Sequence, residues 1–154
     1  MVSSKSILVS SLFSEYTDKG LINTIEIVLK EYKDHNSIPL NIYSDKKLGI
    51  LESTVKYLKE NSNLSYHEIA IILNRDDRTI WATYRKTLKK HEDKFSISSG
   101  GETVDPDIFS NRDNAPLGVL IAHLKSKGMT LKNISLALNR SYKNIWMTDN
   151  KRRK

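Results

Sequence analysis

Apolar residues recur every three or four positions between residues 48 and 58 of the chain. Leu48, Leu51, Val55 and Leu58 therefore share one face of a predicted amphipathic helix. The pattern stops at Asn61-Ser62-Asn63, three polar residues that are typical of a loop. This stretch predicts one helix with a single buried face.

Two shorter helices are predicted to follow. Ser65 and Glu68 have the spacing of a capping box, in which each side chain accepts a hydrogen bond from the other residue's backbone amide, so a helix begins there. Asp76 or Asp77 is a suitable cap for a further helix that runs to Lys90. The inward positions of that helix are Ile80, Tyr84, Thr87 and Leu88.

The same pattern occurs a second time. LSYHEIAIILNRDDRTIWATYRK, Leu64 to Lys86, aligns without gaps with MTLKNISLALNRSYKNIWMTDNK, Met129 to Lys151, with 8 of 23 positions identical. The offset is 65 residues here and 66 upstream, where Ile42-Tyr43-Ser44 matches Ile108-Phe109-Ser110. In the second copy, the expected helix caps are Thr130 and Ser141, and the first helix is expected to end at Gly128. We interpret the pattern as an internal duplication.

The N-terminal segment has an amphipathic stripe of its own, formed by Leu21, Ile25, Val28, Leu29 and Tyr32. Residues 1–37 carry 4 basic and 5 acidic groups, a net charge of −1, so we do not expect them to bind nucleic acid. The stripe must be covered, either by the first copy or by the same helix of a second chain. We favour a homodimer through residues 18–34.

A short helix, a turn and a second, basic helix make up the helix-turn-helix pattern. Leu64-Ser65, Glu68-Ile69-Ala70 and Leu73 resemble the C-terminal DNA-binding region of bacterial sigma factors and its relatives among response regulators. The second copy departs from that pattern, because Asn133 and Ser135 replace Glu68 and Ala70. The usual turn glycine is replaced by Asn74 and Asn139, and asparagine tolerates the left-handed backbone.

The resemblance implies an all-α protein built from tandem three-helix modules of helix-turn-helix (homeodomain-like) type, after an N-terminal amphipathic helix. The predicted divisions are residues 1–37 for the N-terminal helical segment, 38–90 for the first module, 91–103 for a linker and 104–154 for the second, more divergent module. The Ser98-Ser99-Gly100-Gly101 run lies in the linker, and no Lys-Ser/Thr follows it, so it is not a phosphate-binding loop.

Positive charge gathers in the third helix of each copy. The chain has a formal net charge of +7 and a pI near 9.5. Residues 74–90 hold 6 basic and 2 acidic groups, net +4, and residues 139–154 hold 6 and 1, net +5. Because the surplus is concentrated in the helices that the resemblance assigns to DNA, double-stranded DNA is the expected partner.

The outward side chains of these two helices are the candidate contacts. Arg78 has the fork that pairs with guanine, Ala82 or Thr79 suits a thymine methyl group, and Asn144 suits adenine. Lys89 and Lys90 suit phosphates. The predicted set is Arg75, Arg78, Thr79, Ala82, Arg85, Lys86, Lys89 and Lys90 in the first copy, and Arg140, Lys143, Asn144, Met147, Asn150, Lys151, Arg152 and Arg153 in the second.

Two features of the third helices carry further expectations. Trp81 and Trp146 directly follow the inward isoleucines, so we expect them to be buried and to hold the modules together; stacking on bases is the alternative. Asp149 stands where the first copy has Tyr84, so we expect the second copy to pack less tightly or to read DNA less specifically.

Other functional classes receive no support from the sequence. The chain has no Cys, its 4 His share no ligand spacing, and Asp76-Asp77 suits a helix cap better than acid–base catalysis. We therefore expect no metal, no cofactor and no enzymatic activity. The expected protein is a cytoplasmic, nucleoid-associated transcriptional regulator without a membrane segment. The alternative is an adapter that reuses the helix-turn-helix fold to bind RNA or a protein.

Overall fold

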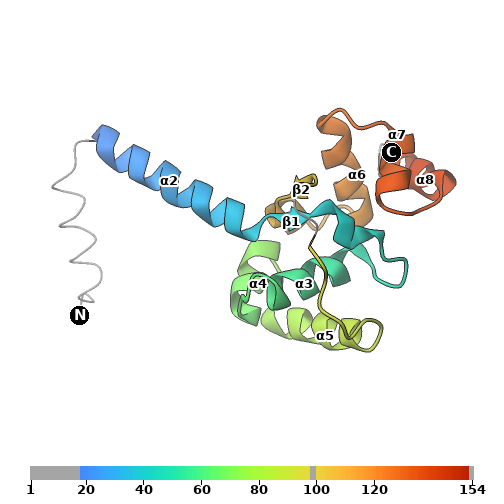
Figure 1. The fold of residues 1–154 in the computed structure, drawn as a ribbon, viewed down its shortest axis with the longest axis horizontal. Coiled ribbons are helices and arrows are strands. Elements are labelled where there is room, and N and C mark those ends of the chain that lie inside the picture. The colour runs from blue at the N-terminus through green and yellow to red at the C-terminus, as the bar shows by residue number, and fades with distance from the viewer. Residues whose placement is uncertain (1–17, 98–99, 153–154) are drawn as a thin grey trace. The chain divides into compact units, whose positions relative to one another are not determined.

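The computed structural model describes residues 18–97 and 100–152, and this part of the chain is mainly helical (Figure 1). Contacts divide the chain into Met1–His35 and Asn36–Lys154. The first of these units contributes most of one helix, and the second contains both copies of the repeat. Among the described residues, no helix is both long enough and apolar enough to cross a membrane.

The predicted N-terminal helix is present as α2, Asp18–Asn36. Its apolar residues are exposed, and the exposed fraction is 44% for Ile25, 57% for Val28 and 53% for Leu29. Three of the five residues of the predicted stripe are therefore exposed, Leu21 is half-buried, and the side chain of Tyr32 lies outside the described residues.

Each copy of the repeat folds into the same series of elements. The first copy comprises β1 (Ile38–Pro39), the 3-10 helix η1 (Leu40–Ser44), α3 (Ile50–Glu60), α4 (Tyr66–Leu73) and α5 (Asp77–Leu88). The second comprises β2 (Thr103–Val104), the 3-10 helix η2 (Pro106–Ser110), α6 (Pro116–Ser126), α7 (Leu131–Ala137) and α8 (Tyr142–Arg152). The three helices expected in each copy are confirmed, and the strand and 3-10 helix that precede them are additional.

Short polar side chains begin the helices as the sequence predicted. The Ser65 hydroxyl accepts from the Glu68 amide at 3.2 Å, and the Glu68 carboxylate accepts from the Ser65 amide at 2.7 Å. Asp76 caps α5 by accepting from the Thr79 amide at 2.8 Å. Thr130 and Ser141 cap α7 and α8 in the same way, at 3.2 Å and 3.3 Å. These bonds satisfy amides that a helix start leaves free.

The turn between the last two helices of each copy relies on an asparagine. Asn74 has φ 51° and Asn139 has φ 49°, both in the left-handed region. An asparagine adopts this conformation more readily than other non-glycine residues, so α4 and α7 can end there without a glycine. Gly128, with φ 89°, ends α6 as expected.

The two copies share a single hydrophobic core. It includes Ile69, Leu73 and Ile80 of the first copy and Ile134 and Ile145 of the second, each with an exposed fraction of 0%. α5 packs on α3 and α4, and α8 packs on α6 and α7. The third helix of each copy is therefore anchored along one face only.

Contacts also join the copies to each other. β1 pairs antiparallel with β2, α4 packs on η2, α7 packs on η1, and α3 contacts α6. The segment expected to be a linker is partly bound to the first copy, since Asn61 Nδ2 donates to the Phe95 carbonyl at 3.4 Å and Asn41 Nδ2 donates to the Ser96 carbonyl at 3.3 Å. The copies thus form one compact body instead of two modules on a free tether.

Candidate nucleic-acid interface

The outward face of α5 presents most of the side chains predicted for the first copy. Ile80 is fully buried, and this fixes the rotation of the helix. The exposed predicted residues of α5 and its C-terminal end are Arg78, Thr79, Ala82, Arg85, Lys86, Lys89 and Lys90. The structure therefore brings these seven side chains onto one helix face, next to solvent.

Acidic neighbours engage some of these groups. Lys90 Nζ lies 2.7 Å from Glu52 Oε1, and Lys86 Nζ lies 3.8 Å from the same atom. Burial acts to raise the pKa of Glu52, but hydrogen bonds from the Gly49 amide and Lys90, and the charge of Lys86, hold it below its usual value. The Thr79 hydroxyl donates to Asp76 at 2.7 Å. Among the described residues, Arg78, Arg85 and Lys89 are thus the cations of this face that form no ion pair with an acidic side chain.

Trp81 lies on this exposed face, and the expectation that it is buried is wrong. Its exposed fraction is 51%, and that of its counterpart Trp146 is 49%. Consecutive residues of a helix are separated by about 100°, so the residue after the inward Ile80 projects sideways and not inward. The Arg85 guanidinium lies 6.0 Å from the Trp81 ring centroid, within the range of a cation–π contact.

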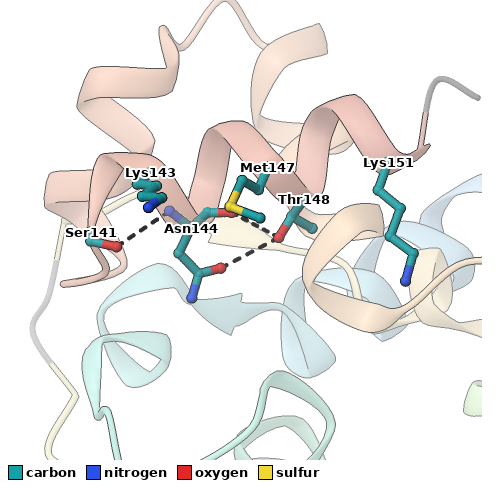
Figure 2. A pocket seen from close by; sticks show the side chains of 6 residues that line it. All are labelled: Ser141, Lys143, Asn144, Met147, Thr148 and Lys151. Atoms are coloured by element: carbon teal, nitrogen blue, oxygen red, sulfur yellow. Dashed lines mark hydrogen bonds between the residues drawn. The ribbon is translucent and has the colours of Figure 1, made fainter.

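The outward face of α8 forms an open pocket on the second copy (Figure 2). The side chains that line it are Ser141, Lys143, Asn144, Met147, Thr148 and Lys151. Four of these six are predicted contact residues. Figure 2 shows them along one side of α8, with the Thr148 hydroxyl bonded to the Asn144 carbonyl at 2.9 Å and lying 3.4 Å from Asn144 Oδ1.

Two further predicted residues of the second copy, Asn150 and Arg152, lie beside this pocket. Asn150 and Lys151 line a neighbouring pocket together with Met147 and Trp146. Arg152 is exposed and its Nη2 lies 3.6 Å from Asp149 Oδ1. Arg153 lies outside the described residues.

The polar residue on the inner side of α8 is ion-paired. Asp149 has an exposed fraction of 1%, and its Oδ2 accepts from Lys125 Nζ at 2.8 Å. In the first copy, Tyr84 occupies the matching position and its hydroxyl donates to Glu60 at 3.0 Å. Burial and the Glu60 carboxylate raise the pKa of Tyr84 to about 12. Each copy therefore closes the same helix–helix seam with a different polar contact.

Two predicted contact residues face the other copy. Arg140 is half-buried, and its Nη2 donates to the Leu48 carbonyl at 3.1 Å. Arg75 is also half-buried; burial first, and then the charge of Arg112, lower its pKa. The structure thus separates Arg75 and Arg140 from the exposed residues of α5 and α8.

The two tryptophans are absent from the contact set predicted from the sequence. The sequence could have indicated their exposure. Each tryptophan lies about 100° from the inward stripe, so it projects from the side of the helix in both copies. Among the described residues, no group of three His, Asp or Glu is placed to hold a metal ion. Comparison of the chain with protein-family models, curated proteins and solved structures gave no match.

Proposed function

We propose that this chain is a DNA-binding protein that regulates transcription through two helix-turn-helix modules, α3–α5 and α6–α8. The observation that carries the proposal is the repeated face: α5 and α8 are each anchored on one side and each present cations and small polar groups on the other. A helix fits the major groove of B-DNA, where such side chains contact base edges and phosphates. In a cell, the protein would act at the nucleoid.

The local geometry supports this reading. α4 ends at Asn74 in left-handed backbone and α5 begins after Asp76, so the turn between the helices is short. α7 and α8 repeat the arrangement around Asn139 and Ser141. A short first helix, a tight turn and an exposed second helix are what this mode of DNA binding requires.

Neutralising the two faces tests the proposal. A variant with Arg78→Gln, Arg85→Gln, Lys143→Gln and Lys151→Gln removes four exposed cations from α5 and α8. We expect its affinity for duplex DNA at constant salt to fall by about 100-fold or more, because each lost phosphate contact weakens binding.

The matched control removes the same charge from other surfaces. The variant with Lys30→Gln, Lys46→Gln, Lys47→Gln and Lys94→Gln neutralises four exposed lysines outside these helices. We expect it to lose less than about 10-fold, through net charge alone. Equal losses in both variants would contradict the assignment of DNA binding to α5 and α8.

One observation favours RNA as a second candidate partner. Trp81 and Trp146 are exposed at equivalent positions, and Arg85 lies over Trp81. Aromatic rings and arginine planes stack on unpaired bases, which are more accessible in RNA loops than in duplex DNA. Competition between duplex DNA and a structured RNA of equal length separates the two: preference for the RNA would reject the DNA proposal.

We further propose that α2 associates with α2 of a second chain. Its exposed apolar residues include Ile25, Val28 and Leu29, which recur at helical spacing. Two such stripes can cover each other, as in other paired amphipathic helices.

A further inference from the structure

The contacts between the two copies are reciprocal. α4 of the first copy packs on η2 of the second, and α7 of the second copy packs on η1 of the first. α3 contacts α6, which is its own counterpart. Contacts in which each partner uses the same two surfaces define an isologous interface, and such an interface has a two-fold axis.

The strand pair lies on this axis. β1 and β2 are antiparallel, and Ile38 is paired with Val104, the residue that the 66-residue offset assigns to the same position of the repeat. A residue that pairs with its own counterpart must lie next to the symmetry axis. Both side chains have an exposed fraction of 0%, so the axis passes through the shared core.

The turn asparagines form a matched pair of hydrogen bonds across the interface. Asn74 Nδ2 donates to the Ser110 carbonyl at 3.3 Å, and Asn139 Nδ2 donates to the Ser44 carbonyl at 3.2 Å. Ser44 and Ser110 are themselves equivalent in the repeat. The asparagine of each turn thus has two roles: its backbone ends the helix, and its side chain binds the other copy.

We propose that the chain is an internal dimer with a pseudo-two-fold axis, and that its target is a single duplex site of two inverted half-sites at one fixed spacing. This inference rests on the proposed DNA binding. Modules related by a two-fold axis bind half-sites related by a dyad of the DNA, whereas a direct repeat needs modules related by translation. The shared core and the paired asparagines hold the spacing, which a flexible tether would leave free.

The test starts from a variant in which both helices present the same face. The native α5 and α8 present different residues, so their half-sites would differ in sequence. The relative orientation of two different half-sites cannot be read from the selected DNA. Four substitutions give α8 the residues that α5 has at Arg78, Thr79, Ala82 and Arg85: Lys143→Arg, Asn144→Thr, Met147→Ala and Asn150→Arg. At the fifth position, Lys151 already matches Lys86. All four positions are exposed or half-buried outside the core. A second variant places the corresponding α8 residues on α5.

The full-length variant is used to select binding sites from random duplex DNA, with the native chain in parallel. We expect an inverted repeat with one centre-to-centre spacing. Reversing one half-site of that duplex should weaken binding by about 100-fold, the loss expected when only one module remains engaged. A selected direct repeat, a single half-site bound as tightly as the pair, or one chain holding two duplexes would overturn the inference. Failure of both chains to enrich any duplex would instead reject the proposed function.

A second experiment loosens the interface without changing either face. Asn74→Gly with Asn139→Gly keeps the left-handed backbone accessible and removes both amide donors. We expect the preference for one spacing over spacings two base pairs longer or shorter to fall from about 10-fold or more to about 3-fold or less. Asn63→Gly is the control, because Asn63 has φ 55° and, among the described residues, forms no hydrogen bond with the second copy. An unchanged spacing preference in the double variant would count against the internal dimer.

Discussion

Arg78 is the residue best placed to read a base. It lies in the first turn of α5, is exposed, and is free of the Glu52 carboxylate that engages Lys86 and Lys90. The guanidinium fork matches two acceptors of guanine in the major groove. Arg78→Ala should therefore cost about 1–3 kcal/mol of binding free energy on the selected site and less on random DNA. Lys89→Ala is the control, since loss of a phosphate contact weakens both duplexes alike; equal losses for Arg78→Ala would make Arg78 a phosphate contact too.

Trp81 gives a prediction that differs from the one its sequence position suggests. A buried tryptophan would cost about 3–5 kcal/mol of stability when truncated to alanine. Trp81 is 51% exposed, so Trp81→Ala should change the free energy of unfolding by about 1 kcal/mol or less. Its affinity for nucleic acid should fall about 10-fold, because the ring and Arg85 form one surface. Thermal melts and binding titrations check both values, with Trp146→Ala in parallel; a large loss of stability at unchanged affinity would restore the buried assignment.

At the scale of the helices, α5 depends on an ionised cap. Hydrogen bonds from the Thr79 hydroxyl and the Thr79 amide hold the pKa of Asp76 below its usual value. A depressed pKa in the folded state means that the stabilisation is fully present above the unfolded pKa, near 4, and is lost as the pH falls through the folded value. Asp76→Ala should therefore lower the Tm at pH 7 and have progressively less effect in acid.

Thr130→Ala is the matched control for this pH dependence. Thr130 caps α7 through a hydroxyl, which does not titrate, so its loss should cost about 1 kcal/mol at neutral and acid pH alike. If the difference in Tm between wild type and Asp76→Ala persists unchanged well below pH 3, the carboxylate does not act as a charged cap.

The sequence was sufficient for the helices because their causes are local. The spacing of Val55 and Leu58, the Ser65–Glu68 capping box and Gly128 act within a few residues of the chain, so each could be interpreted without tertiary structure. The outward set of α5 followed from the inward position of Ile80 for the same reason. Trp81 was misplaced because adjacency in sequence was taken for adjacency on the helix surface.

The short strands and the docking of the copies could not be predicted in this way. A strand of two residues, such as Ile38–Pro39, has no periodicity, and the residues that it pairs with, Val104 and Thr103, are distant in the sequence. The hydrogen bonds of Asn74 and Arg140 to the other copy depend on how the copies pack, which the repeat alone does not specify. The sequence shows the same Asn-Arg dipeptide in both copies, Asn74-Arg75 and Asn139-Arg140. However, an arginine beside a predicted DNA-binding helix also suits a phosphate contact, so the dipeptide did not indicate a contact between the copies.

At the scale of the whole molecule, α2 should control the oligomeric state. Ile25→Glu with Val28→Glu places two charges in its exposed apolar stripe, so a dimer of the full chain should dissociate to monomers at micromolar concentration. Ile27→Glu is the control, because Ile27 is 58% exposed but projects from the opposite side of the helix. Sedimentation equilibrium gives the mass; a native chain that is already monomeric at that concentration would contradict the dimer.

The salt dependence of duplex binding is the decisive measurement of whether α5 and α8 contact nucleic acid. Residues 74–90 and 139–154 carry net charges of +4 and +5, and α5 and α8 expose most of their described cations. If roughly six phosphates are contacted, the association constant should fall by about five decades for each decade of salt. A slope near five in a plot of log affinity against log salt, measured for the full chain on duplex DNA, is the predicted result. A slope near zero would contradict the assignment of this protein to nucleic acid.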